Sequence, residues 1–295
     1  MDGIYPASIT PFNGEGQFQA EVLLRLMERN IAEGASGFFI GGSSGECFLL
    51  GEAERIAVFE AAATFRGRTT LIAHIGAVST AEAIRYALAA TRLGFQHIAA
   101  TPPFYYGFSA ELIAGYYYDI AAAAGMPVMI YNFPGNTNKP FNLEHPATVE
   151  LLRSQAIFGI KHTNLDLSQM ERIKALSPGL SIMNGYDETM VAGLALGADG
   201  SIGSTFNFML PHFKKIYDRY RAGKGREALA LQVKANNIMA ALNRVGLIPA
   251  IKYILEGQGI AAGPARKPFV ALSADQRSYL DGVLRTNLCN AEDGK

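Results

Sequence analysis

Two side chains suited to carbonyl chemistry end consecutive apolar runs of the chain. Residues 156–160 lead into Lys161, and residues 127–130 lead into Tyr131. Both runs have the length and composition of buried strands, so each reactive side chain stands where a strand leaves the core. If these strands are parallel neighbours, a primary amine and a phenol emerge side by side. Such a pair can form a Schiff base with a ketone and relay its protons.

The surroundings of Lys161 favour a nucleophilic amine. Burial beside an apolar strand disfavours the ammonium form, so we expect the pKa of Lys161 to be lowered. A neutral amine attacks a ketone, and the resulting iminium withdraws electrons from the carbon–carbon bond next to it. Taken alone, the same run also fits a solvated lysine at a strand end.

The alternation of elements predicts the fold class. Short apolar runs alternate with longer amphipathic segments as far as about residue 220. This alternation implies parallel βαβ units, and eight repeats favour a (β/α)8 TIM barrel over an open doubly wound sheet. The predicted strands cover residues 3–9, 37–40, 70–75, 97–101, 128–131, 157–161, 180–184 and 200–202. The predicted barrel helices cover residues 20–32, 52–63, 81–93, 110–124, 167–176, 189–196 and 211–222.

The chain beyond the barrel reads as helical. Residues 226–242, 249–258 and 273–284 carry helical patterns, and no linker or low-complexity stretch separates them from the barrel. We therefore divide the chain into a (β/α)8 barrel, residues 1–222, and C-terminal helices packed on it, residues 223–295. Such an extension can support oligomer contacts or cap the barrel.

Polar residues follow six of the eight predicted strands, at the end where barrel enzymes carry their chemistry. Ser43 and Ser44 stand between glycines after the second strand, where hydroxyls and backbone N–H groups suit a carboxylate or simply form a polar turn. Asp187 and Glu188 follow the seventh strand and begin a helix, where they fit the helix dipole or a polyol equally well. Ser204 follows the eighth strand and can cap a helix or bind a ligand.

Composition limits the classes of function. Hydrophobic residues make up 49% of the 295 residues and charged residues 18%, enough for a large core. The 26 basic and 26 acidic residues balance, which argues against nucleic acid or anionic membrane as a partner. We find no signal peptide or apolar stretch of membrane-spanning length, and the two cysteines, Cys47 and Cys289, do not suggest a disulfide scaffold. We expect a cytoplasmic protein.

No motif in the sequence calls for a metal or a nucleotide. The five histidines show no ligand spacing, and no Cys-x-x-Cys pair suggests zinc. Neither a Gly-x-Gly-x-x-Gly nor a phosphate loop occurs. We therefore expect no cofactor besides a covalent lysine Schiff base with the substrate.

Five motifs in order along the chain resemble one known family. They are GGSSGE (41–46), TPPFYY (101–106), YNFPGN (131–136), GIKHT (159–163) and NGYDE with GADGSIGST (184–188 and 197–205). They are similar to those of the pyruvate-dependent class I aldolases, the family that contains N-acetylneuraminate lyase and dihydrodipicolinate synthase. The resemblance covers nearly the whole chain.

The resemblance implies a mechanism and an assembly. Lys161 matches the residue that forms the Schiff base, and Tyr131 matches the proton carrier. Ser43 and Ser44 match the residues that hold the pyruvate carboxylate. Tyr105 matches a tyrosine that reaches into the site of a neighbouring subunit, which implies a homotetramer built as a dimer of dimers.

The resemblance also bears on the substrate. Asn136 stands where dihydrodipicolinate synthases carry an arginine, whereas the GYDE stretch resembles sialic acid lyases. In those lyases, sugar hydroxyls are bound at the positions of Thr163, Gly185, Asp187, Glu188 and Ser204. The leading hypothesis is therefore cleavage of N-acetylneuraminate to N-acetylmannosamine and pyruvate.

Two departures from the lyase pattern keep other substrates open. Ile248 replaces a phenylalanine near the sugar tail, and Asn138 stands where a glycine usually follows the tyrosine motif. An aldolase for 2-keto-3-deoxy sugar acids and a dihydrodipicolinate synthase are the alternatives within enzymes. A catalytically silent barrel that binds a keto acid is an alternative from another class.

Overall fold

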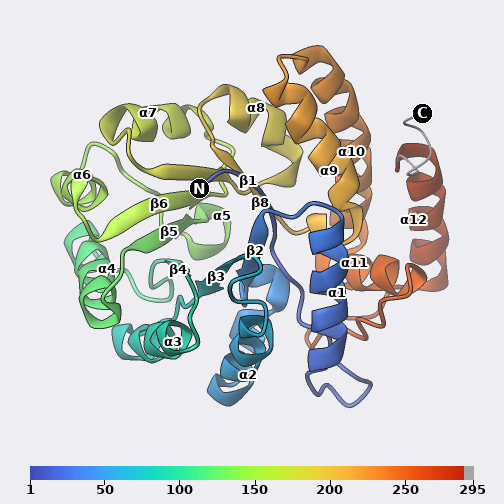
Figure 1. Ribbon diagram of the computed structural model, residues 1–295, viewed down its shortest axis with the longest axis horizontal. Helices are drawn as coiled ribbons and strands as arrows, with labels where there is room; N and C mark the ends of the chain where they lie inside the picture. Colours follow the sequence, from blue (N-terminus) through green and yellow to red (C-terminus); the bar gives the residue numbers. More distant parts are fainter. Residues whose placement is uncertain (289–295) are drawn as a thin grey trace. The chain divides into compact units, whose positions relative to one another are not determined.

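Short apolar strands alternate with helices through the part of the chain that the structure describes, residues 1–288 of a computed structural model (Figure 1). The strands are β1 (Gly3–Pro6), β2 (Gly37–Ile40), β3 (Thr70–His74), β4 (His97–Ala100), β5 (Val128–Asn132), β6 (Ile157–His162), β7 (Ser181–Asn184) and β8 (Gly200–Gly203). Every residue of β2, β5 and β8 is buried, which fits strands covered on both faces.

Some of the helices between and after the strands begin at a side-chain cap. The helices are α1 (Ala20–Ala32), α2 (Glu52–Ala63), α3 (Thr80–Arg92), α4 (Ala110–Ala124), α5 (Pro134–Thr137), α6 (Pro146–Arg153), α7 (Ser168–Leu176), α8 (Met190–Ala195), α9 (Phe206–Arg221), α10 (Gly225–Val245), α11 (Leu247–Gly257) and α12 (Ala274–Asn287). The side chains of Ser79, Ser109 and Ser273 accept backbone N–H groups at the starts of α3, α4 and α12.

Within residues 1–288 the strands form one eight-stranded sheet with the order β1-β8-β7-β6-β5-β4-β3-β2. From β3 to β8, each strand pairs in parallel with the next one along the chain. Strands that are neighbours in both sequence and space, with helices between them, are the topology of a (β/α)8 TIM barrel. The predicted fold class is confirmed, including a C-terminal helical extension.

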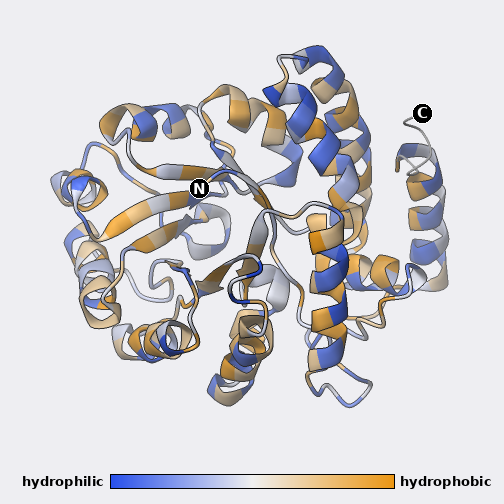
Figure 2. Ribbon diagram, in the orientation of Figure 1, coloured by the Kyte–Doolittle hydropathy of each residue, from blue (hydrophilic) through white to orange (hydrophobic). Residues whose placement is uncertain are grey.

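One compact unit, which we call the lysine unit, consists of Met1–Gly3 and Ala63–Ile202. Helices α3, α4, α6 and α7 lie along the outside of its strands (Figure 1), and each of these helices contacts the next. Figure 2 shows apolar residues along β5 and β6 and mixed residues on α7, as expected for a buried strand core under half-exposed helices.

The second compact unit, the serine unit, consists of Ile4–Ala62 and, within the described part of the chain, residues 203–288. Its β1 and β2 run in parallel, with a bridge between Ala7 and Phe39 just beyond β1. Helix α10 packs against α9, α11 and α12. The division of the chain at residue 222 stays a prediction.

Two short helices of the lysine unit were not predicted. Helix α6 fills the connection between β5 and β6, and α5 is a single turn directly after β5. Pro146 occupies the first turn of α6, where its missing N–H costs nothing, and His145 Nδ1 accepts the N–H of Ala147. With eight residues, α6 shows too few turns for a clear helical period.

Helix α9 begins five residues before the predicted start. The backbone leaves helical geometry at Met209 (φ −132°, ψ 36°), two residues before Pro211. Proline has no N–H to donate to the preceding turn, so a helix that contains it kinks there. The predicted helix corresponds to the segment after the kink.

Among the described helices, no single one is long and apolar enough to cross a membrane. Helices α10 and α11 reach that length and composition only when taken together, and they are bent by 116° at their junction.

Candidate active site

Lys161 and Tyr131 lie side by side at the carboxyl ends of β6 and β5. The two residues are direct partners in the parallel register, and Lys161 Nζ lies 4.0 Å from the centroid of the Tyr131 ring. Both side chains are buried, with 4% and 3% of their surface exposed. The predicted juxtaposition of an amine and a phenol is therefore confirmed.

A buried polar network lies on the other face of the same strand ends. Asn132 and His162 are the next register pair, and successive strand residues point to opposite faces. Asn132 Nδ2 donates to His162 Nδ1 and to Gln169 Oε1, both at 3.1 Å. His162 Nε2 lies 3.0 Å from the carbonyl oxygen of Asp166. These contacts fit a neutral imidazole protonated on Nε2.

The network anchors the loop that follows Lys161. Burial lowers the pKa of His162, while the carbonyl and the carboxylate of Asp166 oppose that shift. Gln169 in turn donates to the carbonyl oxygen of Phe141. The neutral imidazole thus holds the turn at residues 163–166 to the end of β6 without adding a positive charge next to Lys161.

Thr163 and Gly185 form the next layer of the lysine unit. Gly185 N donates to the carbonyl oxygen of His162 at 2.8 Å, and a Cβ atom at position 185 would overlap Thr163 Oγ1. Only glycine allows this close approach. Thr163 Oγ1 is buried and has no hydrogen-bond partner among the described residues, so it is suited to bind a ligand hydroxyl.

Asp187 and Glu188 stand on a short turn after β7. They begin a single 3-10 turn, Asp187–Thr189, that leads into α8, in place of the α-helical start expected from the sequence. Asn184, the last residue of β7, holds this turn because its Nδ2 donates to the Tyr186 carbonyl oxygen at 2.6 Å. Asp187 is buried. It follows β7, which pairs with β6, so its carboxylate lies at the same end of the sheet as Lys161.

A row of aromatic rings connects the end of β5 with the end of β7. The Phe133 ring stacks on Tyr131 with 5.6 Å between centroids and meets the Tyr186 ring edge-on at 6.0 Å. Burial raises the pKa of Tyr186, and the charge of Glu188 adds to that shift. Tyr186 is therefore a neutral phenol at physiological pH.

Ser43, Ser44 and Ser204 belong to the serine unit. After β2 the chain turns at Gly41, whose φ of +68° favours glycine, and then forms the 3-10 turn Ser43–Gly45. The hydroxyls of Ser44 and Ser204 lie 2.6 Å apart, so the loop after β2 meets the loop after β8. The structure thus brings together two of the predicted ligand-binding serines.

Tyr105 lies apart from the lysine–tyrosine pair. Its side chain is 76% exposed, and its ring meets Tyr106 edge-on with 5.0 Å between centroids. Most of Tyr105 is therefore open to solvent in the described chain.

No group of three or more histidine, cysteine or acidic side chains within residues 1–288 is arranged to hold a metal ion. Cys47 is buried, and Cys289 lies outside the described residues.

Sequence reasoning missed the residues that support the site. Asn132 and Gln169 in the network, and Asn184 under the Asp187 turn, were not singled out. The available signal was position, since Asn132 and His162 directly follow Tyr131 and Lys161 and must point to the opposite face. Gln169 is seven residues from His162 and carries no comparable signal.

Asn138 adopts a left-handed conformation that explains one departure from the family pattern. Its φ is 50° and its ψ 32°, at the end of α5. Glycine and, next to it, asparagine tolerate this region best. The asparagine therefore fits a turn that otherwise favours glycine.

Comparison with known proteins identifies the family of this chain. The family model for the dihydrodipicolinate synthetase family matches residues 1–287. The N-acetylneuraminate lyase of Rhizobium meliloti is 41% identical over 270 residues, which cover 91% of this chain and 89% of that protein.

Two solved structures share the fold over nearly their full length. A crystal structure of CdNal from Clostridium difficile in complex with mannosamine has a TM-score of 0.93 and 34% identity, covering 97% of this chain and 99% of the other. The N-acetylneuraminate lyase from Fusobacterium nucleatum has a TM-score of 0.91 and 32% identity, covering 98% and 99%. The chain belongs to the dihydrodipicolinate synthetase family.

Proposed function

We propose that the protein is a class I aldolase that cleaves N-acetylneuraminate to N-acetylmannosamine and pyruvate. The observation that carries the proposal is the buried pair of Lys161 and Tyr131, in register at the ends of β6 and β5. The relatives from Rhizobium meliloti and Fusobacterium nucleatum, both named N-acetylneuraminate lyase, support the choice of substrate.

The chemistry begins at the Lys161 amine. Its lone pair attacks the C2 ketone of the open-chain sugar acid, and the carbinolamine loses water to give an iminium. Tyr131 carries the protons of these steps. It then takes the proton of the C4 hydroxyl as the C3–C4 bond breaks and its electrons move to the iminium, which becomes an enamine. Protonation of the enamine carbon and hydrolysis release pyruvate and restore the amine.

Other side chains bind the parts of the substrate that do not react. Following the family resemblance, Ser43 and Ser44 hold the carboxylate. The sugar hydroxyls are assigned to Thr163, Gly185, Asp187, Glu188 and Ser204. The unpaired, buried Thr163 Oγ1 supports this assignment, because a buried hydroxyl without a partner is costly unless a ligand supplies one.

Condensation of pyruvate with aspartate semialdehyde is less well supported. That reaction needs a cation for the carboxylate of the aldehyde, and position 136 holds asparagine in place of the usual arginine. Cleavage of other 2-keto-3-deoxy sugar acids uses the same chemistry and stays the main alternative. A silent keto-acid-binding barrel would not need the pairing of lysine with tyrosine.

The proposal includes the setting of the reaction. We assign no metal or external cofactor, because the Schiff base is the electron sink. The exposed Tyr105 supports an assembly in which this side chain reaches a neighbouring subunit, within a homotetramer built as a dimer of dimers. We place the protein in the cytoplasm, with small-molecule substrates as its ligands.

The test is release of pyruvate from N-acetylneuraminate, followed through lactate dehydrogenase and NADH. We expect turnover by the purified protein and none by Lys161→Ala. The same assay with 2-keto-3-deoxy sugar acids ranks the substrates by kcat/KM. A higher kcat/KM for one of those acids would contradict the proposed substrate, and undiminished turnover by Lys161→Ala would contradict the mechanism.

A further inference from the structure

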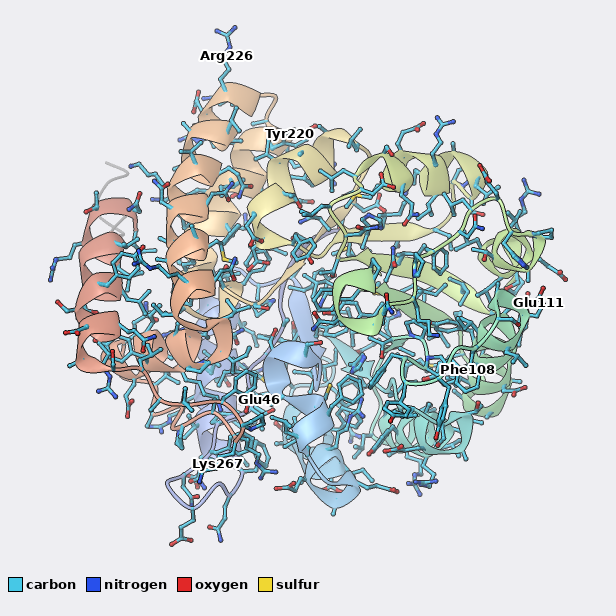
Figure 3. The ribbon with its side chains drawn as sticks, turned by 180° about the vertical axis from the view of Figure 1, so that it is seen from behind. Glu46, Phe108, Glu111, Tyr220, Arg226 and Lys267 are labelled. Carbon is cyan, nitrogen blue, oxygen red and sulfur yellow. The ribbon has the colours of Figure 1, made fainter. Side chains whose placement is uncertain are left out.

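A buried ion pair is formed by Glu46, which directly follows the turn that carries the serines assigned to the carboxylate. Glu46 Oε1 is 2.7 Å from Lys252 Nζ, with only 0% and 2% of the two side chains exposed. Glu46 Oε2 accepts the backbone N–H of Arg266 at 2.7 Å. Figure 3 shows Glu46 beside the C-terminal segment that carries Lys267, so residues more than 200 positions apart meet here.

Glu46 connects two tight turns of the serine loop, residues 41–49. The 3-10 turn Ser43–Gly45 precedes it and the 3-10 turn Cys47–Leu49 follows it. Glu46 N donates to the Ser43 carbonyl oxygen at 3.0 Å, and Leu49 N donates to the Glu46 carbonyl oxygen at 2.8 Å. The course of the chain at Glu46 therefore sets the position of both serines.

The backbone conformation of Glu46 is unfavourable by itself. Its φ of 58° and ψ of 32° lie in the left-handed region, which is unfavourable for a residue with a Cβ atom. Outside contacts must hold such a conformation. The side chain of Glu46 makes them, since each of its two oxygens meets a partner from the C-terminal part of the chain.

Lys252 supplies one of these contacts with its ammonium group, and Arg266 supplies the other with its backbone N–H. Lys252, on α11, also donates to the Pro264 carbonyl oxygen at 3.0 Å and lies 4.2 Å from the centroid of the Phe12 ring. Arg266 lies 4.5 Å from the same centroid. Its guanidinium donates to the Leu49 carbonyl oxygen at 3.0 Å, which ends the second turn, and forms a forked ion pair with Glu54.

We propose that Lys252 and Arg266 are positioning residues, which hold the serine loop in the shape that binds the substrate carboxylate. This inference rests on the proposed function, in particular on the role of Ser43 and Ser44. It gives the C-terminal segment 247–268 a task in substrate binding, although it contributes no group to the reacting atoms.

The chemistry of the pair favours positioning over stability alone. A buried ion pair recovers little more than the cost of removing its charges from water, and apolar residues of similar size often stabilise a protein as well or better. A pair that served only stability could therefore be replaced by apolar residues. A pair that fixes a strained loop could not, because an apolar side chain at position 46 cannot accept the N–H of Arg266.

The test measures trapping of pyruvate on the enzyme by borohydride as a function of pyruvate concentration. The variants are Glu46→Gln, which keeps size but removes the charge, and the double variant Glu46→Leu/Lys252→Met, which makes the pair apolar. The control is Lys174→Met. It removes the Lys174–Asp199 ion pair of the lysine unit, which is 3.0 Å long.

We expect the double variant to keep its maximal trapping rate. Its half-saturating pyruvate concentration should rise about tenfold, the factor that corresponds to about 1.4 kcal/mol of lost binding. Glu46→Gln should shift in the same direction by a smaller factor, because it keeps the acceptor for Arg266 N–H, and Lys174→Met should not shift.

Half-saturation equal to that of the control in both Glu46 variants would overturn the inference. Equal losses of maximal rate and affinity would overturn it too, because general disorder of the fold predicts that pattern. If the unchanged protein forms no trapped adduct, the proposed function itself is contradicted and the inference falls with it.

Discussion

Gly185 offers a sharp test of the packing at the carboxyl ends of the strands. A methyl group at this position would overlap Thr163 Oγ1, lie 2.9 Å from Thr163 Cβ and lie 3.1 Å from the His162 carbonyl oxygen. Neither neighbour can retreat easily, because Thr163 is buried and β-branched and the carbonyl oxygen accepts the N–H of Gly185 itself.

The cost of Gly185→Ala follows from these contacts. Turning Thr163 off its rotamer costs about 1 kcal/mol, and weakening the hydrogen bond to His162 costs about 1 kcal/mol more. The sum of about 2 kcal/mol lies within the usual range for overpacking a core. Replacing glycine by alanine also restricts the unfolded chain, which stabilises the folded state by about 0.7 kcal/mol. A matched glycine-to-alanine control removes this contribution.

Gly179→Ala is that control, because a Cβ atom at Gly179 meets no atom within 4 Å and the position is exposed. Urea unfolding should place Gly185→Ala about 2 kcal/mol below Gly179→Ala in stability. The KM for N-acetylneuraminate should rise, since Thr163 is displaced, while pyruvate is still trapped on Lys161. Adding Thr163→Ala should restore part of the lost stability. Equal stability of the two alanine variants would refute the packing argument.

Two further predictions concern pH and the serine loop. Burial is the main cause that lowers the pKa of His97, His162 and His212. As the pH falls, these histidines therefore bind protons in the unfolded chain before they do so in the folded chain. The folded state loses stability as the pH falls below about 6.5, the ordinary pKa of histidine. The thermal midpoint should therefore drop between pH 7.5 and pH 5. It should drop less in His212→Gln, and equal drops of the two proteins would contradict the assignment. The second prediction concerns Ser44. Ser44→Ala removes the 2.6 Å contact with Ser204 and should raise the half-saturating pyruvate concentration about tenfold at an unchanged maximal trapping rate. Ser177→Ala, which loses a hydroxyl bonded to the Leu152 carbonyl oxygen, is the control, and an equal response of both variants would contradict a role for Ser44 in binding.

The fold and the reactive pair could be predicted because both depend on short-range patterns. Apolar runs of strand length alternate with helical periods, and the βαβ rule then orders the strands. The neighbourhood of Lys161 and Tyr131 follows from two strands that are consecutive in the chain. Helix α6 escaped the same reasoning because eight residues give little more than two turns of signal.

The supporting contacts could not be predicted, for a physical reason. Glu46 and Lys252 are more than 200 residues apart, and nothing in their local sequence marks them as partners. The closeness of Gly185 to Thr163 depends on how two strand ends approach each other. Such contacts arise from tertiary packing, which the periodicity of one segment does not encode.

The central claim is that Lys161 forms a Schiff base with pyruvate, and intact-protein mass spectrometry tests it directly. After incubation with pyruvate and borohydride, the chain should gain the mass of one pyruvate less one water plus two hydrogens, and peptide mapping should place the gain on Lys161. Lys161→Ala should show no gain, while Lys174→Met should gain the same mass as the unchanged protein. A chain that gains no mass, or gains it on another lysine, would contradict the account.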